Sequence, residues 1–107
     1  MRRAAPATML AIALAAAVIC LADVSRAQFA TEQKQAQCEL AAIRDTRSAV
    51  AIATIRSACN WLALNEGSLL NESLRPYYFC LVQNLSGVQD DRAAGVIVSA
   101  CRTANRL

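Results

Sequence analysis

The chain contains no histidine, and this absence excludes several kinds of chemistry. Without an imidazole there is no Ser-His or Cys-His pair to activate a nucleophile, no histidine ligand for a metal ion, and no side chain whose ordinary pKa lies near neutrality. The three glycines, Gly67, Gly87 and Gly95, are too scattered for a phosphate-binding loop. We therefore expect a protein that is not an enzyme and that holds no cofactor or metal.

A surplus of positive charge is also missing once the N-terminal segment is set aside. The 107 residues include 11 basic and 8 acidic side chains. Residues 1–27 hold three of the basic and one of the acidic residues, which leaves eight and seven, a net charge of +1. Nucleic-acid binding needs clustered positive charge, so we expect no nucleic-acid partner. Arg44, Arg47 and Arg56 could hold a small anion, but solvated surface arginines are the simpler interpretation.

The N-terminal residues follow the order of a secretory signal peptide. Arg2 and Arg3 precede an apolar run over residues 9–22, and residues 25–27 (Ser-Arg-Ala) place small side chains where a signal peptidase cuts. We predict a signal-peptide helix over residues 1–27 and an exported protein, periplasmic or secreted. A membrane-spanning helix needs about 20 apolar residues, and this run is shorter, which favours a cleaved leader. An inner-membrane anchor formed by an uncleaved N-terminal helix is the alternative.

Four cysteines remain after the leader, which contains the fifth, Cys20. They follow one another at equal intervals along the chain: Cys38, Cys59, Cys80 and Cys101. An even number of cysteines in a short exported chain indicates disulfides, which a domain of this size needs because its core is small. Zinc normally takes cysteines in pairs about two to four residues apart, so the much wider spacing here does not favour a metal site.

The sequence around the cysteines occurs in two similar copies. Residues 38–60, CELAAIRDTRSAVAIATIRSACN, align with residues 80–102, CLVQNLSGVQDDRAAGVIVSACR. The matches fall on the cysteines and on apolar positions, where a packing unit would preserve them. We therefore predict that residues 28–107 form one small domain in which one structural unit is used twice.

Apolar residues recur at helical spacing within both copies, and no segment alternates long enough for a strand. Capping residues and helix breakers give the boundaries. The first helix is predicted to run from Thr31 to about Ile43, and the second from Asp45 or Thr46 to about Glu66, with Gly67 as its stop. The third is predicted to begin at Pro76 and to stop at Ser86 and Gly87, and the fourth to begin at Asp90 or Asp91. The predicted fold is all-α, with four helices in two disulfide-stapled helical hairpins after the signal-peptide helix.

Four cysteines allow three pairings. The repeat favours Cys38 with Cys59 and Cys80 with Cys101, one disulfide in each copy. A nested pairing, Cys59 with Cys80 and Cys38 with Cys101, is the alternative. It is supported by geometry, because Cys59 and Cys80 lie at similar distances from the turn between the second and third helices.

Aromatic residues form the main candidate for a contact surface. Trp61 lies shortly after Cys59, and Tyr77, Tyr78 and Phe79 directly precede Cys80. Consecutive residues of a helix point about 100° apart, so the last three cannot all face one small core and at least one should be exposed. An exposed aromatic side chain is a suitable anchor for a partner. We expect Phe29 to lie in a frayed N-terminus.

Carboxylate catalysis is the least favoured alternative. Its candidates are Asp45, Glu66, Glu72 and the pair Asp90-Asp91. Capping of the fourth helix explains the pair more simply. A Ser-Lys dyad would need Lys34, the one lysine of the chain, which lies in a polar run typical of a solvated helix face.

These observations predict a small exported, non-enzymatic helical protein. Its expected role is a protein-interaction or structural module of the bacterial periplasm or cell envelope, with a protein partner that the sequence does not identify. A disulfide-stapled helical domain that binds a lipid or membrane surface is the alternative.

Overall fold

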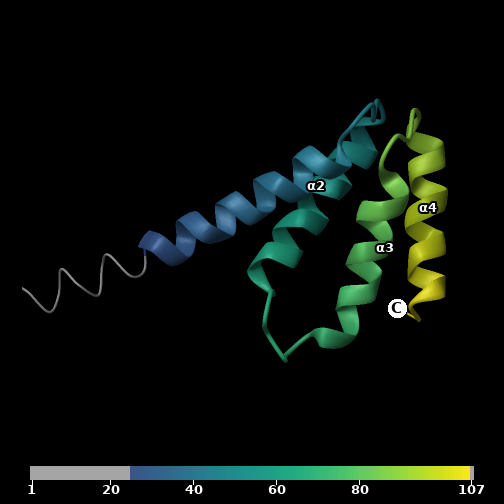
Figure 1. Cartoon of the computed structure of the whole chain (residues 1–107). Coiled ribbons are helices and arrows are strands. Elements are labelled where there is room, and N and C mark those ends of the chain that lie inside the picture. The colour runs from purple at the N-terminus through teal and green to yellow at the C-terminus, as the bar shows by residue number, and fades with distance from the viewer. Residues whose placement is uncertain (1–24, 107) are drawn as a thin grey trace, which may run out of the picture. The chain divides into compact units, whose positions relative to one another are not determined.

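The computed structural model describes residues 25–106, which lie in helices, turns and short connections without any strand. Residues 25–42 are helical and are called the first helix below. They are followed by α2 (Ala49–Leu64), the 3-10 turn η1 (Glu72–Leu74), α3 (Arg75–Leu85) and α4 (Asp91–Ala104) (Figure 1). The all-α prediction is confirmed. Residues from Thr31 onward form one compact unit.

The predicted signal peptide falls almost entirely outside the described residues. Residues 25–27, at its predicted end, are helical and exposed. Among residues 25–106, no helix combines the length and the apolar character that a membrane crossing requires.

Two disulfides join the helices in pairs. Cys38 is bonded to Cys59, which ties the first helix to α2, and Cys80 is bonded to Cys101, which ties α3 to α4. The paired Cα atoms are 5.6 and 5.8 Å apart, within the range that a disulfide bridges. Both disulfides have the same sequence separation, 21, and each lies within one copy of the repeat. The chain is thus built from two disulfide-stapled helical hairpins.

The second helix of each hairpin begins in the same way. The Ser48 side chain accepts a hydrogen bond from the backbone N–H of Ala51, at 3.0 Å, and caps α2. The Asp90 side chain accepts one from Ala93, at 2.8 Å, and caps α4. Both caps have extended backbone, as an N-cap requires. Ser48 and Asp90 occupy equivalent positions in the two copies, so the sequence repeat is also a structural repeat.

The turn inside each hairpin contains a residue with left-handed backbone. Asp45 has a φ of 47° in the first hairpin, and Gly87, its counterpart in the second copy, has a φ of 81°. Glycine adopts this conformation without strain, and aspartate tolerates it better than most residues. The residue after each of them donates its N–H back to a carbonyl of the same turn, from Thr46 to Ile43 and from Val88 to Leu85.

The structure corrects the predicted starts of two helices. Thr31 is not an N-cap, because residues 25–30 before it are already helical. Neither Asp45 nor Thr46 caps α2. The Thr46 hydroxyl instead accepts a hydrogen bond from the Gly87 N–H at 2.8 Å and donates one to the Arg44 carbonyl at 3.0 Å, so it joins the two hairpin turns.

The end of α2 also differs from the prediction. The helix ends at Leu64 rather than near Glu66, and Asn65 is its C-cap: its backbone N–H makes the last helical hydrogen bond to the Trp61 carbonyl, and its side-chain amide donates to the same oxygen. Gly67, with a φ of 76°, lies beyond this cap rather than at it. The predicted boundaries of α3 and α4 are confirmed: Pro76 lies in the first turn of α3, Ser86 follows its last residue, and Asp90 caps α4.

Hydrogen bonds join the two hairpins at their turns. The Arg47 and Ser48 N–H groups both donate to the Val88 carbonyl, at 3.0 and 3.1 Å. The Ser48 hydroxyl donates to the Asp91 carboxylate at 2.6 Å. Because each of these bonds connects one copy of the repeat to the other, they set the two hairpins side by side.

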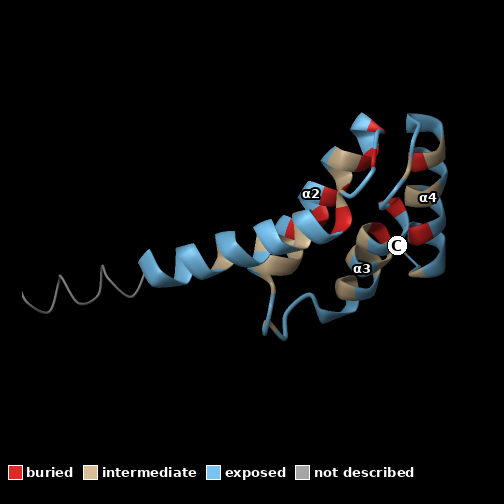
Figure 2. Cartoon of the chain, turned by 45° about the horizontal axis from the view of Figure 1, so that its top comes forward, coloured by how far each residue is buried: buried red, intermediate tan, exposed pale blue. Residues whose placement is uncertain are grey.

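The core lies where the helices of the two hairpins meet. It consists of small and medium side chains: Ala42, Ala51, Ile55, Ala58, Cys59, Leu81, Leu85, Ala94 and Cys101. Figure 2 shows the buried residues of α2, α3 and α4, in red, on the sides that face one another. Helices α2, α3 and α4 all contact one another, so the core is formed jointly by these three helices.

Candidate functional site

Three of the four predicted contact aromatics form one cluster between α2 and α3. The Trp61 and Tyr78 rings are stacked, with centroids 4.2 Å apart and planes inclined by 11°. Tyr77 meets Tyr78 edge to face, with centroids 5.1 Å apart. All three are half-buried. Pairs of this kind stabilise packing beyond their buried area, so this cluster holds α3 on α2.

Phe79 is placed differently from the other three. It is 46% exposed, as expected for at least one residue of the run from Tyr77 to Phe79. It lines a groove of about 270 Å³ between the first helix, the end of α2 and the start of α3. The structure therefore separates one accessible aromatic side chain from three that pack against each other.

The groove has an apolar floor. The Cys38–Cys59 disulfide, Leu62 and Ala63 line it together with Phe79. None of these groups offers a strong hydrogen-bonding or titrating atom, so the floor favours an apolar occupant.

Charged side chains stand at the rim of the groove. Lys34 and Glu66 form an ion pair with a 2.8 Å distance between Nζ and Oε2, and about half of each side chain is exposed. The Arg75 guanidinium donates to the Asn65 carbonyl at 3.0 Å and so links α3 to the end of α2. An exposed ion pair contributes little to stability. Lys34 and Glu66 can therefore separate and bind polar groups of a ligand at a small cost in free energy.

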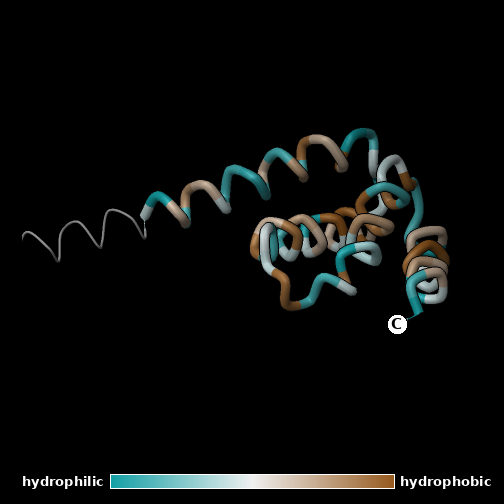
Figure 3. The backbone as a smooth tube through the Cα atoms, turned by 60° about the horizontal axis from the view of Figure 1, so that its bottom comes forward, coloured by the Kyte–Doolittle hydropathy of each residue, from teal (hydrophilic) through white to brown (hydrophobic). Residues whose placement is uncertain are grey.

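Exposed leucines lie at the end of α2 and in the connection that follows it. Leu64 at the end of α2 is 64% exposed, and Leu69 and Leu70 in the following connection are 87% and 78% exposed. Figure 3 shows this hydrophobic stretch, in brown, in the connection that follows α2. Single exposed leucines are ordinary, but Leu69 and Leu70 are adjacent in sequence and both strongly exposed, and exposed apolar side chains that gather in one place can mark an interaction site.

The predicted carboxylates do not share one cleft. Glu66 pairs with Lys34 at the groove, while Asp90 and Asp91 lie at the start of α4. The Asp45 carbonyl accepts a hydrogen bond from Gln89 in the turn region, and Glu72 begins η1. In the part of the chain that the structure describes, no group of three or more acidic or cysteine side chains is arranged to hold a metal ion.

Asp91 is the carboxylate with the most distinct surroundings. The Ser48 hydroxyl, which donates to it, is the main cause of a pKa lowered below the ordinary 3.8, and the N–H of Val50 acts in the same direction. A general acid needs a raised pKa, whereas hydrogen bonds of this kind keep a carboxylate ionised. Asp91 therefore acts as a link between hairpins.

The predicted basic residues are mostly engaged or dispersed. The Arg56 Nε donates to the Glu39 carboxylate at 3.3 Å, which ties α2 to the first helix. Arg44 and Arg47 contribute backbone groups to the hairpin turns. Lys34 is exposed, as expected for a solvated helix face, and also lines the groove.

Sequence reasoning missed the groove itself. Leu69 and Leu70 lie in a connection without helical periodicity, so no pattern indicated on which side they emerge. The exposed leucines, unlike the groove, had a signal in their position along the chain: Leu69 and Leu70 follow Gly67 and precede Pro76, where a short connection has no core to enter.

A family model described as "Four-cysteine protein VF_A0006-like" matches residues 14–105. This match covers most of the chain and includes all four paired cysteines, and the chain belongs to this family. Neither a curated protein nor a solved structure matches the chain.

Proposed function

We propose that this member of the four-cysteine family is an exported, non-enzymatic protein-interaction module of the bacterial periplasm or cell envelope. Its binding site is the groove beside the Cys38–Cys59 disulfide. The observation that carries the proposal is the position of Phe79, which is 46% exposed and lines a groove with an apolar floor.

The size of the groove favours one side chain of a protein over a free small molecule. Its volume of about 270 Å³ lies below the range of roughly 300–1,000 Å³ that is typical of small-molecule pockets. A large apolar side chain of a partner, seated between Phe79 and Leu62, would remove both surfaces from water. Aromatic anchors in such pockets account for much of the free energy of protein association.

The chemistry of the lining supports a role in binding rather than catalysis. Among the described residues that line the groove, Glu66 is the one acid, and it is paired with Lys34. A two-carboxylate hydrolase needs two acids facing one cleft. Export is supported by the two disulfides, because cytosolic thiols are kept reduced.

A lipid surface is the second candidate ligand. Leu69 and Leu70, 87% and 78% exposed on a connection between helices, favour it, because apolar side chains at the tip of a domain can enter a membrane interface. Arg75 near the groove could contact an anionic headgroup.

A photoreactive benzoylphenylalanine at position 79 distinguishes these candidates in cells that produce the whole chain. We expect a discrete adduct with one envelope protein after irradiation, and we expect Leu69→Ser with Leu70→Ser to weaken it. The matched control places the same group at Val50, which is 43% exposed and lies in the first turn of α2, about 18 Å along the helix from Leu62.

Each outcome decides between the candidates. A protein adduct at 79 and not at 50 supports the proposal, and the intact mass of that adduct shows whether residues 1–27 have been removed. An adduct with lipid overturns the protein partner in favour of the lipid surface. No adduct at 79, or the same adduct from both positions, overturns both.

A further inference from the structure

Two helices of the unit carry an outward face that no other described helix covers. On α4 this face, called the α4 face below, has Val96 at its centre, 65% exposed, with Ala100 and Thr103 also exposed. On the first helix the corresponding surface, called the first-helix face, has Leu40 at its centre, 77% exposed, with Ala36 and the half-buried Ile43.

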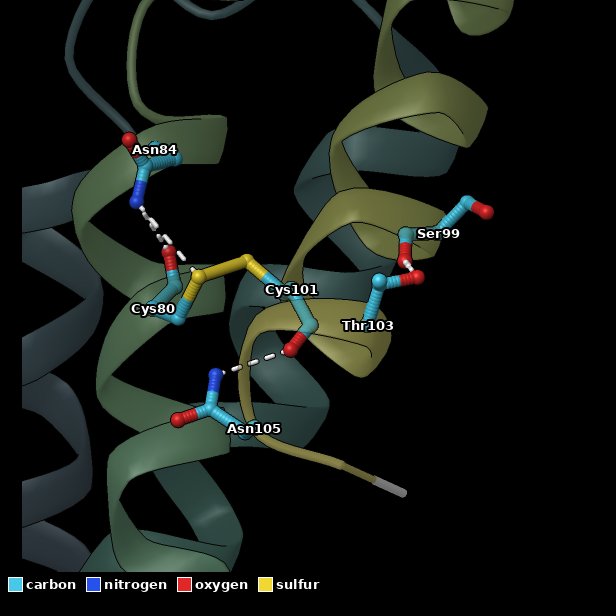
Figure 4. Close-up of a disulfide and its surroundings, with 6 residues drawn as sticks. All are labelled: Cys80, Asn84, Ser99, Cys101, Thr103 and Asn105. Carbon is cyan, nitrogen blue, oxygen red and sulfur yellow. Dashed lines mark hydrogen bonds between the residues drawn. A yellow bond between two sulfur atoms is a disulfide. The ribbon is translucent and has the colours of Figure 1, made fainter.

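The Thr103 hydroxyl on the α4 face is hydrogen-bonded within the helix. Figure 4 shows Ser99 and Thr103 on the side of α4 away from the Cys80–Cys101 disulfide, with the Thr103 hydroxyl donating to the Ser99 carbonyl at 3.1 Å. The Asn84 and Asn105 amides lie on the disulfide side, where they donate to the Cys80 and Cys101 carbonyls at 2.8 Å. The α4 face therefore offers mainly small and apolar side chains around Val96.

The sequence repeat identifies what the α4 face corresponds to. Val96, Ala100 and Thr103 are the counterparts of Thr54, Ala58 and Trp61 on α2. In α2 this face is covered by α3: Ala58 has no exposed surface, and Trp61 stacks on Tyr78. The α4 face is thus the second copy of a surface that is used for helix packing in the first hairpin.

The same repeat identifies the counterpart of the first-helix face. Ala36, Leu40 and Ile43 correspond to Tyr78, Val82 and Leu85 on α3. Tyr78 packs against Trp61, and Leu85 is fully buried in the core. The α4 face therefore corresponds to the side of α2 that packs on α3, and the first-helix face corresponds to the side of α3 that packs on α2.

We propose that these two faces bind each other between copies of this chain, the first helix of one copy packing on α4 of another as α3 packs on α2. The same antiparallel register lays Ala36 against Thr103 and Ile43 against Val96, with Leu40 between them. Where the internal interface has the large Trp61 and Tyr78, the contact between copies has the small Thr103 and Ala36, so the two helices can approach more closely.

The contact joins two different surfaces and is therefore heterologous. Such a contact extends into a chain of copies, or closes when each of two copies uses both faces on the other. Arg44 and Arg92 lie on the two faces near the same end of the contact, so their repulsion weakens association at low ionic strength. Association is therefore measured at about 0.15 M salt, where the Debye length is about 8 Å and the repulsion between the two arginines is screened.

Sedimentation equilibrium of the purified whole chain over a concentration series up to the millimolar range tests the proposal. We expect the average mass to rise above that of one chain as the concentration increases. Leu40→Lys and Val96→Lys each place a charge on one face at an exposed position, so the fold tolerates them, and each should weaken self-association by about tenfold or more. Leu69→Lys, at an exposed leucine outside both faces, is the matched control and should associate as the unaltered chain does.

Mixing the two lysine variants is the decisive step. Each retains the face that the other has lost, so a 1:1 mixture should form a complex of two chains that grows no further. A chain that stays monomeric throughout, variants that associate normally, or a mixture that fails to pair overturns the proposal. Because neither Leu40 nor Val96 lines the groove beside Phe79, loss of partner capture and loss of self-association are measured separately.

Discussion

The two hairpins share their construction and differ in their surroundings. Each has a disulfide with a sequence separation of 21, a left-handed residue in its turn, and a capped second helix. Yet Ala58 of α2 is fully buried, whereas its counterpart Ala100 of α4 is exposed. The repeat thus determines the hairpin, and the position of each hairpin in the unit determines which of its faces enter the core.

The strongest test of the likeness between the hairpins is removal of their disulfides. The two variants are Cys38→Ala with Cys59→Ala, and Cys80→Ala with Cys101→Ala. Since both closed loops have the same length, the loop-entropy model predicts that each pair of substitutions lowers the free energy of unfolding by about 3 kcal/mol. Urea unfolding followed by circular dichroism measures both losses.

Removing both disulfides should leave the chain largely unfolded, and reductant should have the same effect on the unaltered protein. If the two variants lose free energies of unfolding that differ by more than about 1 kcal/mol, the two disulfides do not stabilise their hairpins equally, because loops of the same length cannot produce such a difference. Thermal unfolding that reductant leaves unchanged contradicts a stabilising role for either disulfide.

A smaller effect sharpens the difference between the hairpins. Ile55 of α2 has no exposed surface, whereas its counterpart Ile97 of α4 is half-buried. Ile55→Ala should therefore cost about 3 kcal/mol, since it leaves a cavity at the centre of the core, and Ile97→Ala about 1 kcal/mol. Urea unfolding of both variants gives the comparison, and equal losses show that α4 is packed as completely as α2.

The smallest predicted effect concerns the link between the hairpins. Asp91 accepts a hydrogen bond from Ser48, and its counterpart in the first hairpin is Ala49, so this link exists in one copy only. The Ser48 hydroxyl lowers the pKa of Asp91. The Ser48–Asp91 hydrogen bond therefore contributes to stability above the ordinary pKa of 3.8, and this contribution is lost as the pH falls through the lowered pKa. Asp91→Asn should reduce the unfolding temperature near pH 7 and flatten its fall in acid.

Thermal unfolding across the acidic range, from about pH 7 to about pH 2, measures this effect. Asp90→Asn is the matched control, because an asparagine oxygen caps a helix as well as aspartate does. An acid dependence that is the same in Asp91→Asn and in the unaltered chain shows that other groups cause it.

The parts that could be predicted from the sequence are those that depend on local signals. Pro76 and Asp90 mark the starts of α3 and α4, because a missing N–H and a capping carboxylate act within one turn of helix. The cap of α2 was also within reach: Ser48 is the counterpart of Asp90 in the repeat, a stronger indication than the nearer candidates Asp45 and Thr46.

The groove could not be predicted, because it depends on how helices meet. The spacing of Tyr77, Tyr78 and Phe79 shows that they point in different directions, but the side that α2 occupies decides which of them is exposed. Only the placement of α3 against Trp61 buries Tyr78 and leaves Phe79 beside the first disulfide. That the exposed residues bind a partner stays a prediction.

The order of the disulfides along the chain has a consequence for how the protein matures. A growing polypeptide emerges with its N-terminus first, at about 5–20 residues per second. Cys38 and Cys59 are therefore both available before Cys80 has been synthesised, and Cys80 and Cys101 are the two that remain. Among the four cysteines that follow Cys20 and the predicted leader, pairing each with the next to appear yields the native connectivity, so oxidation can proceed along this part of the chain without a disulfide that must later be reshuffled.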